Sequence, residues 1–370
     1  MKNKVLNGTK NKIANKTLPP PVAKIENRKF FSKRIPLGYV ILITLTFCVI
    51  FYWRNNKLDA GTRDNRLPVI EMNTNLSPSE VKYRANNYQF ARPLLLTDAS
   101  SESEKLSSLK NDLNDFIKNK RKSGKIINAS VYVERLNDSQ WRNVNDDLFY
   151  TPGSLMKVPT MMIFLRESEI KPELLNKEIF YSKVPGDLSV QTFNSGSIEP
   201  GMNYTIRKLL YFMIAKSDNH STMLLDAQLS YPMLNQLFAD LGLPAVDNKS
   251  TSYSITASGY SRFLRMLYNA TYISNEDADF ALSLLTESTF TKGLSAGLPD
   301  GTKIAHKFGE AGSATGGRTQ LHESGIVFMD NNPYLITVMT RGLDVELLPE
   351  IISEISSRVY KEMTLLAGNS

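Results

Sequence analysis

The chain has 370 residues, enough for one large domain or two smaller ones with a substantial core. Its composition is that of an ordinary globular protein, with 42% hydrophobic and 22% charged residues. The single cysteine, Cys48, excludes an internal disulfide and a cysteine metal cluster. The three histidines are too scattered in the sequence to suggest a zinc site (His220, His306 and His322). We therefore expect no metal and no other cofactor.

The net charge of +7 is concentrated at one end of the chain. Residues 1–34 carry ten basic residues and one acidic residue, a charge of +9, so the remaining residues sum to −2. A groove that binds nucleic acid needs a basic surface on the folded part of the protein. The charge distribution therefore predicts that nucleic acid is not a partner.

An uncharged hydrophobic run, residues 35–53, follows the basic tail. As a helix it is long enough to cross a hydrocarbon core of ~30 Å, and aromatic residues that favour the membrane interface lie near its ends (Tyr39, Tyr52 and Trp53). We predict a single-pass membrane anchor with a cytoplasmic N-terminus, which places the rest of the chain outside the cytoplasmic membrane. The alternatives are a cleaved signal peptide and a lipoprotein signal. No small-x-small site follows the run, and Phe47 before Cys48 is too large for a lipobox.

The remaining chain divides into a polar, Asn-rich linker, residues 54–102, and one domain, residues 103–367. Helical spacing of apolar residues predicts helices near the two ends of the domain and through its middle (103–122, 204–215, 221–228, 232–241, 257–269, 275–285 and 345–366). Alternating patterns predict strands toward both ends (126–136, 141–149, 302–308, 324–329 and 334–340). This order predicts an α+β fold, with an antiparallel sheet built from both ends of the domain, packed with helices, and an inserted all-helical subdomain.

A Pro-Gly turn followed by an apolar helix carries the first candidate catalytic residues, Ser154 and Lys157. Their spacing places both side chains on one face of the first helical turn. A serine hydroxyl needs a base within hydrogen-bond reach, and a lysine can serve only if burial or a second cation lowers its pKa. The spacing alone does not decide the matter, because Ser-x-x-Lys also begins elsewhere (Ser79, Ser107 and Ser168).

Two further motifs complete a set: Ser217-Asp-Asn219 after an expected helix, and Lys307-Phe-Gly309 on an expected strand. In this order, the three motifs resemble those of the penicillin-recognising serine hydrolases, and most of all the class A β-lactamase branch. The resemblance extends over residues 104–365. It implies a β-lactamase/transpeptidase-like fold and an acyl-enzyme at Ser154, formed with a β-lactam or with the amide of a peptidoglycan stem peptide.

The resemblance also implies the roles of four catalytic residues. Ser154 would be the acylated nucleophile, and Lys157 would accept its proton. Ser217 would relay a proton to the leaving nitrogen while Lys307 polarises its hydroxyl and lowers the pKa of Lys157. Two alternatives stay open: Ser217 could only cap the following helix, and Lys307 could be a solvated strand residue. We expect structural roles for Asp218, His306 and His322.

The substrate-binding residues implied by the resemblance are Asn219, Gly309 and Glu310. Asn219 would hold Lys157 and the amide side chain of the substrate, and the backbone N–H of Glu310 would be the second oxyanion donor beside the helix N-terminus at Ser154. Phe308 departs from the family, because a hydroxyl residue that binds the substrate's carboxylate usually stands there. The Gly-rich segment that follows offers three substitutes (Arg318, Ser313 and Thr315).

A second departure concerns deacylation. Class A β-lactamases carry a Glu-x-x-Leu-Asn loop after Ser-Asp-Asn, and its glutamate activates the deacylating water. Here the interval 241–255 contains no Glu and only Asp247 as an acid, while Glu173-Leu-Leu-Asn176 lies upstream of Ser217 and is one residue short. We therefore expect slow turnover or peptidase-like behaviour rather than fast β-lactam hydrolysis. The alternative function is a non-catalytic cell-wall binding or sensor module on the same fold.

Overall fold

The computed structural model describes Phe90 and residues 102–183, 191–193, 196–247, 253–312, 318–330 and 332–368. The basic tail, the hydrophobic run 35–53 and nearly all of the linker lie outside these residues. Among the residues described, no helix combines the length and the apolar character needed to span a membrane.

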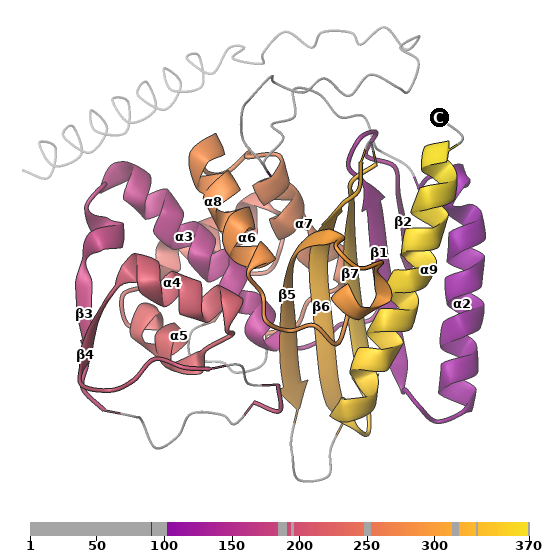
Figure 1. Cartoon of the computed structure of the whole chain (residues 1–370), viewed down its shortest axis with the longest axis horizontal. Helices are drawn as coiled ribbons and strands as arrows, with labels where there is room; N and C mark the ends of the chain where they lie inside the picture. Colours follow the sequence, from indigo (N-terminus) through magenta and orange to yellow (C-terminus); the bar gives the residue numbers. More distant parts are fainter. Residues whose placement is uncertain are drawn as a thin grey trace, which may run out of the picture. The chain divides into compact units, whose positions relative to one another are not determined.

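An antiparallel sheet of five strands, in the order β2-β1-β7-β6-β5, forms the centre of the domain (Figure 1). The strands are β1 (Asn128–Arg135), β2 (Trp141–Val144), β5 (Lys303–Gly312), β6 (Thr319–Phe328) and β7 (Tyr334–Gly342). β1 from the start of the domain pairs with β7 near its end, so the predicted sheet assembled from both ends is confirmed.

Helices cover both faces of this sheet (Figure 1). α2 (Ser107–Lys122) and α9 (Leu348–Gly368) lie on one face, and α7 (Ala257–Tyr268) packs on the other. Residues along β7 alternate accordingly, because successive side chains of a strand point to opposite faces. Ile336 and Val338 join the core beneath α2 and α9, whereas Leu335 and Met339 join the core shared with the helical block.

The helical block lies between β1–β2 and β5 in the sequence and carries the rest of the core. It contains α3 (Lys157–Ile170), α4 (Ile206–Ala215), α5 (Asn219–Asp226), α6 (Tyr231–Asp240) and α8 (Asn275–Thr286). This arrangement agrees with the predicted helical insertion.

Several predicted boundaries are wrong. The strand expected at 141–149 ends at Val144, and the strand expected at 324–329 begins at Thr319. The helix expected from residue 204 begins two residues later. A small two-stranded sheet, β3 (Glu178–Tyr181) with β4 (Met202–Thr205), takes up the preceding residues. The Thr205 Oγ1 accepts a hydrogen bond from the Lys208 backbone N–H at 3.2 Å. Because this bond satisfies a free N–H of the first helical turn, Thr205 caps α4, and the chain before it remains extended.

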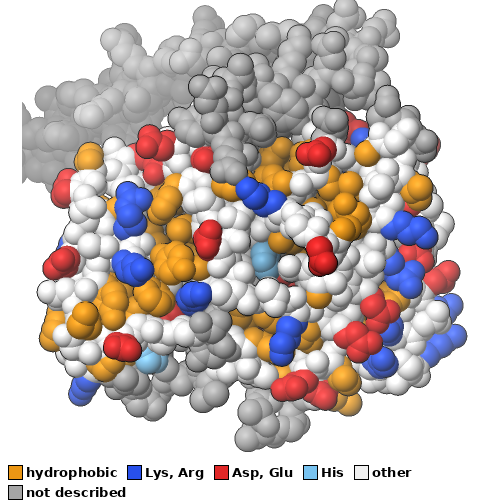
Figure 2. Space-filling view, in the orientation of Figure 1, with side chains coloured by type: hydrophobic (Ala, Val, Ile, Leu, Met, Phe, Trp, Pro, Cys, Tyr) orange, Lys and Arg blue, Asp and Glu red, His pale blue; other side chains and the backbone are white. Residues whose placement is uncertain are grey.

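Charged side chains of both signs are interspersed over the face of the domain shown in Figure 2, without a broad basic stripe.

Candidate active site

Ser154 lies in a short 3-10 turn, Gly153–Met156, that continues directly into α3. The turn is held against the core of the domain, because the buried Tyr260 hydroxyl donates a hydrogen bond to the Leu155 carbonyl oxygen at 2.8 Å. Leu155 is itself fully buried, whereas Ser154 keeps partial exposure at the surface of a pocket. The nucleophile candidate is thus a partly open hydroxyl on a rigid turn.

Two glycines allow this turn to lie against strand β5. Gly153 has a φ of +55°, which favours glycine, and a Cβ there would lie 2.1 Å from the Glu310 carbonyl oxygen. A Cβ on Gly309 would lie 2.3 Å from the Pro152 carbonyl oxygen. Any side chain at either position would therefore separate the turn from the strand. The contact brings the backbone of Glu310, the predicted oxyanion donor, next to the Ser154 turn.

Lys157 is buried, with 3% of its surface exposed, and its Nζ is held by three acceptors. It donates to the Ser217 carbonyl oxygen at 2.5 Å, to the Asn219 Oδ1 at 2.9 Å and to the Ser217 Oγ at 3.3 Å. Burial lowers the pKa of Lys157 to about 7, although the charges of Asp218 and Asp226 oppose the shift. A substantial fraction of Lys157 is therefore neutral near pH 7 and able to accept a proton.

Ser217 and Lys307 form the second part of the buried network. The Lys307 Nζ donates to the Ser217 Oγ at 2.8 Å and to the Phe308 carbonyl oxygen at 2.8 Å. Lys307 is only 1% exposed, so it is not a solvated strand residue. Burial, and next the charge of Lys157, lower its pKa well below the ordinary value. The cap of α5 is the Asp218 side chain, so Ser217 is not merely a helix cap.

The backbone of Ser217 adopts a φ of +55°, a left-handed conformation that is uncommon for residues other than glycine. Strained backbone of this kind persists where the surroundings fix it, and here Asp218 does so. Its carboxylate accepts from the backbone N–H groups of His220 and Ser221 at 3.1 and 2.9 Å, and from the Ser197 hydroxyl at 2.5 Å. This is the structural role predicted for Asp218.

The two strand histidines are structural, as predicted. The His322 Nδ1 accepts from the Thr340 backbone N–H at 3.2 Å, so its Nε2 carries the proton and donates to the Thr151 carbonyl oxygen at 3.1 Å. Burial lowers the pKa of His322 to about 3 and keeps the ring neutral. His306 is buried and bonded to Glu323 at 2.5 Å.

Of the three residues expected to bind a substrate carboxylate, Arg318 is the one that the structure describes, and it does not line the pocket. The Phe308 side chain is buried and stacks on Phe290, with ring centroids 4.4 Å apart, in the core beneath α9. Arg318 is exposed at the start of β6. Ser313 and Thr315 lie outside the described residues.

The pocket that contains Ser154 has a volume of about 580 Å³. Four of the residues that line it were singled out from the sequence (Ser154, Lys157, Asn219 and Glu310). Ser217 and Lys307 are buried and reach this pocket through Lys157. Asp247 and Glu173, the acids weighed for deacylation, are exposed and do not line it.

Gln191 also contacts Ser154, although nothing in the sequence predicted it. Its Nε2 donates to the Ser154 Oγ and to the Asn219 Oδ1, both at 3.1 Å. The neighbouring Thr192 is tied to the Glu310 carboxylate through its backbone N–H at 3.0 Å and its hydroxyl at 2.5 Å. No motif marks Gln191, because the β3–β4 connection carries it to the pocket from a distant part of the chain.

Three polar residues that were not predicted from the sequence line the same pocket: Thr160 on α3, and Thr222 and Asp226 on α5. For the two residues on α5, the spacing in the sequence could have indicated their position. Asn219, Thr222 and Asp226 follow a spacing of three and then four residues, which places them on one face of α5.

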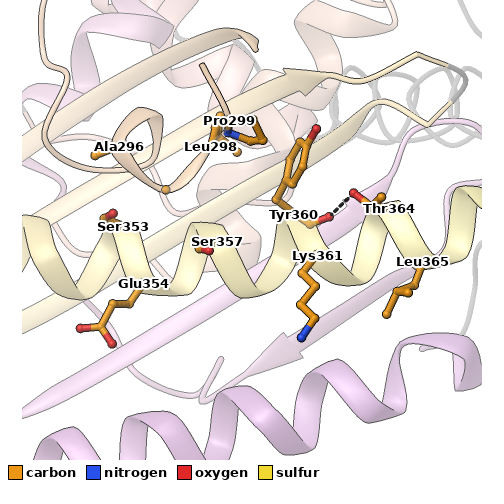
Figure 3. Close-up of a pocket in the computed structure, with 11 residues that line it drawn as sticks. Ala296, Leu298, Pro299, Ser353, Glu354, Ser357, Tyr360, Lys361, Thr364 and Leu365 are labelled. Carbon is orange, nitrogen blue, oxygen red and sulfur yellow. Dashed lines mark hydrogen bonds between the residues drawn. The ribbon is translucent and has the colours of Figure 1, made fainter. Parts of the chain in front are cut away.

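A larger cavity, of about 710 Å³, lies away from this site, between the segment 296–299 and α9 (Figure 3). Ser353, Glu354, Ser357 and Lys361 come to it from successive turns of α9. None of the motif residues lines this larger cavity, so the candidate active site is the smaller pocket at Ser154.

Comparison with known proteins agrees with this geometry. A family model described as the beta-lactamase enzyme family matches residues 108–363, which is more than half of the chain. The chain belongs to the β-lactamase enzyme family.

Individual relatives of this β-lactamase family protein support the same fold. It is 25% identical over 258 residues to the β-lactamase VEB-1 of Pseudomonas aeruginosa, a match that covers 65% of this chain and 84% of VEB-1. The crystal structure of the TLA-1 extended-spectrum β-lactamase has a TM-score of 0.60 at 21% identity and covers 70% of this chain and 99% of TLA-1. PBP-A has a TM-score of 0.59 at 20% identity and covers 72% of this chain and 98% of PBP-A.

Proposed function

We propose that this protein is a serine hydrolase or acyltransferase that forms an acyl-enzyme at Ser154 with a β-lactam or with the amide of a peptidoglycan stem peptide. The observation that carries the proposal is the buried network in which Lys157 and Lys307 both donate a hydrogen bond to the Ser217 hydroxyl. A module that only binds a ligand does not need two desolvated lysines bonded to one serine hydroxyl, because burying such cations is costly.

The network supplies a route for the proton during acylation. Neutral Lys157 accepts the proton of the Ser154 hydroxyl as its oxygen attacks the amide carbon, and a tetrahedral oxyanion forms. The Ser217 hydroxyl donates its proton to the leaving nitrogen and regains one from Lys157, which returns to its neutral form. The C–N bond breaks and the acyl group remains on Ser154. Backbone N–H groups of Ser154 and Glu310 would stabilise the oxyanion.

A solved structure of a related protein supports a β-lactam as one substrate. A mutant of PBP-A, similar to this chain with a TM-score of 0.57 and 21% identity, was solved as an acyl-enzyme complex with penicillin G. We therefore take penicillin as the probe for this pocket, and a peptidoglycan stem peptide as the second substrate class to test.

We further propose that the residues 103–367 act outside the cytoplasmic membrane, held by a helix at 35–53 and a linker at 54–102, with the basic tail 1–34 in the cytoplasm. The support is the uncharged run and the basic residues that precede it. Recovery of the protein with the membrane fraction, and its release when residues 1–53 are deleted, would test the anchor.

The second candidate is a non-catalytic cell-wall binding or sensor module. One observation favours it: among the described residues, the hydrogen bond to the Ser154 hydroxyl comes from Gln191 and not from Lys157. In the catalytic proposal, the bound substrate breaks the hydrogen bond between Gln191 and Ser154. In the sensor proposal, Ser154 is never acylated.

Labelling of the full-length chain with a fluorescent penicillin separates the two. We expect a covalent, denaturation-resistant label that is lost in Ser154→Ala. Ser168→Ala and Ser107→Ala, which alter two other Ser-x-x-Lys serines, are the matched controls and should keep the label. Absence of label from the unaltered protein, with penicillins and with a general serine-hydrolase probe, would reject the catalytic proposal.

A further inference from the structure

Asp226 is a carboxylate in the Ser154 pocket that no sequence motif assigns. It lies in the last turn of α5, on the helix face that also carries Asn219 and Thr222. All three line the pocket together with Ser154 and Lys157. The pocket therefore holds an acid from α5, although the interval 241–255 supplies no glutamate.

Among the residues that the structure describes, two carboxylates line the pocket, Asp226 and Glu310, and they differ in what they contact. The Glu310 carboxylate is occupied by the backbone N–H and hydroxyl of Thr192. Within the described part of the chain, the Asp226 carboxylate makes no hydrogen bond and no ion pair, and the residue is accessible to solvent. Asp226 is thus the pocket carboxylate with free lone pairs and access to water.

The charged and titratable groups around Asp226 are Lys157 and Tyr231. Desolvation of the carboxyl by the surrounding protein raises the pKa of Asp226 to about 6, even though part of the residue stays accessible to water, and the Lys157 charge opposes this rise. A carboxylate with a pKa near 6 is ionised at neutral pH and is more basic than an ordinary aspartate. Both properties suit a general base.

We propose that Asp226 is the general base that activates water for deacylation of Ser154; the inference rests on the proposed acyl-enzyme. Asp226 takes one proton from a water molecule while the water oxygen bonds to the acyl carbon, which forms a tetrahedral oxyanion. When this intermediate collapses, the bond between the carbon and the Ser154 Oγ breaks. The serine oxygen then takes a proton through Lys157, and this transfer restores the Asp226 carboxylate. One water is consumed, and a carboxylic acid and the serine hydroxyl are formed.

This assignment differs from the family pattern in the origin of the base. In the pattern described above, the acid comes from a loop that follows Ser-Asp-Asn. Here it comes from the helix that Asn219 begins, seven residues along the same face. Thr160 and Thr222 also line this pocket. Their hydroxyls donate to the carbonyl oxygens of Met156 and Asp218, at 3.1 and 2.8 Å, so each can still accept a hydrogen bond from a water molecule.

The test compares acylation with release in the full-length protein. Fluorescent penicillin is bound, excess probe is removed, and the loss of label is followed over time for the unaltered chain, Asp226→Asn and Asp226→Glu. Asp240→Asn on α6 is the control, because Asp240 is a carboxylate that contacts Gln236 and lies outside the pocket. Acylation rates are measured in the same samples and show that each variant retains a folded site.

We expect Asp226→Asn to slow release about 100-fold or more while acylation changes by less than about threefold, and Asp226→Glu to recover part of the release rate. In the unaltered chain, release should rise with pH through about 6, since only the ionised carboxylate is a base. This dependence should be absent in Asp226→Asn.

Three results would overturn the proposal: an Asp226→Asn variant that releases label as fast as the unaltered chain, an equal fall in acylation and release, or an unaltered chain that retains its label for hours. None of these three results would contradict the proposal that an acyl-enzyme forms at Ser154. Failure of the unaltered chain to become labelled would instead reject the proposed function.

Discussion

The Nζ of Lys157 lies 2.5 Å from the carbonyl oxygen of Ser217, a residue whose backbone has a φ of +55°. The left-handed conformation of Ser217 thus accompanies a backbone acceptor that holds the candidate base in place. The same residue presents its hydroxyl to Lys307 at 2.8 Å. Ser217 therefore links the two lysines through both its backbone and its side chain.

Replacement of Lys157 tests its role as a base. Lys157→Met removes the amine with little change in volume, and we expect the acylation rate to fall about 10²–10⁴-fold because the Ser154 proton loses its acceptor. The acylation rate of Lys157→Arg should fall by a similar factor, since a guanidinium stays protonated and cannot accept the proton. The second-order rate constant for labelling by fluorescent penicillin measures both.

The pH profile of acylation provides an independent prediction. A lysine is a base only when neutral, that is, above its pKa, and burial lowers the pKa of Lys157 to about 7. The acylation rate of the unaltered chain should therefore rise as the pH increases through about 7 and level off above it. A rate that continues to climb toward pH 10 would show that Lys157 keeps the pKa of an exposed lysine.

Ser217→Gly and Ser217→Ala form a matched pair. Both remove the hydroxyl and should abolish acylation by interrupting the proton relay, but only glycine accepts a φ of +55° without steric cost. We expect Ser217→Gly to have a free energy of unfolding higher than that of Ser217→Ala by about 1 kcal/mol. Urea denaturation measures the difference, and equal stabilities would contradict the conformational argument.

Gly309→Ala tests the contact between β5 and the nucleophile turn. The added Cβ would meet the Pro152 carbonyl oxygen at 2.3 Å and the Leu155 backbone nitrogen at 2.8 Å. We expect the turn to shift and labelling at Ser154 to fall at least about 100-fold, because small misplacements of reacting groups are costly. Gly368→Ala is the control, since a Cβ there meets nothing within 4 Å.

Phe308→Thr restores the hydroxyl residue usual in the family. Because the Phe308 ring packs on Phe290 in the core, we expect no gain in acylation and a loss of stability of about 3 kcal/mol. Phe308→Leu should lower the stability by less than Phe308→Thr does, because leucine leaves a smaller cavity. Thermal unfolding and labelling are measured together, and a rise in labelling of Phe308→Thr would show that this position faces the substrate.

The sequence predicted the sheet from both ends, the helical insertion and the motif residues, because apolar periodicity and turn residues are local signals. Strand alternation was underused: Lys307 faces the buried network, so its neighbour Phe308 must face the other side of β5. Helical spacing would likewise have indicated Asp226 once the start of α5 was known. Gln191 could not have been found, since only the tertiary fold brings its loop to Ser154.

The most direct test of the central claim is mass spectrometry of the full-length chain, quenched with acid while excess penicillin G is still present so that the adduct is trapped before its release. The account predicts an increase equal to the mass of one penicillin, mapped by digestion to the peptide that contains Ser154 and absent from Ser154→Ala. An unchanged mass, or an adduct on any other residue, would contradict it.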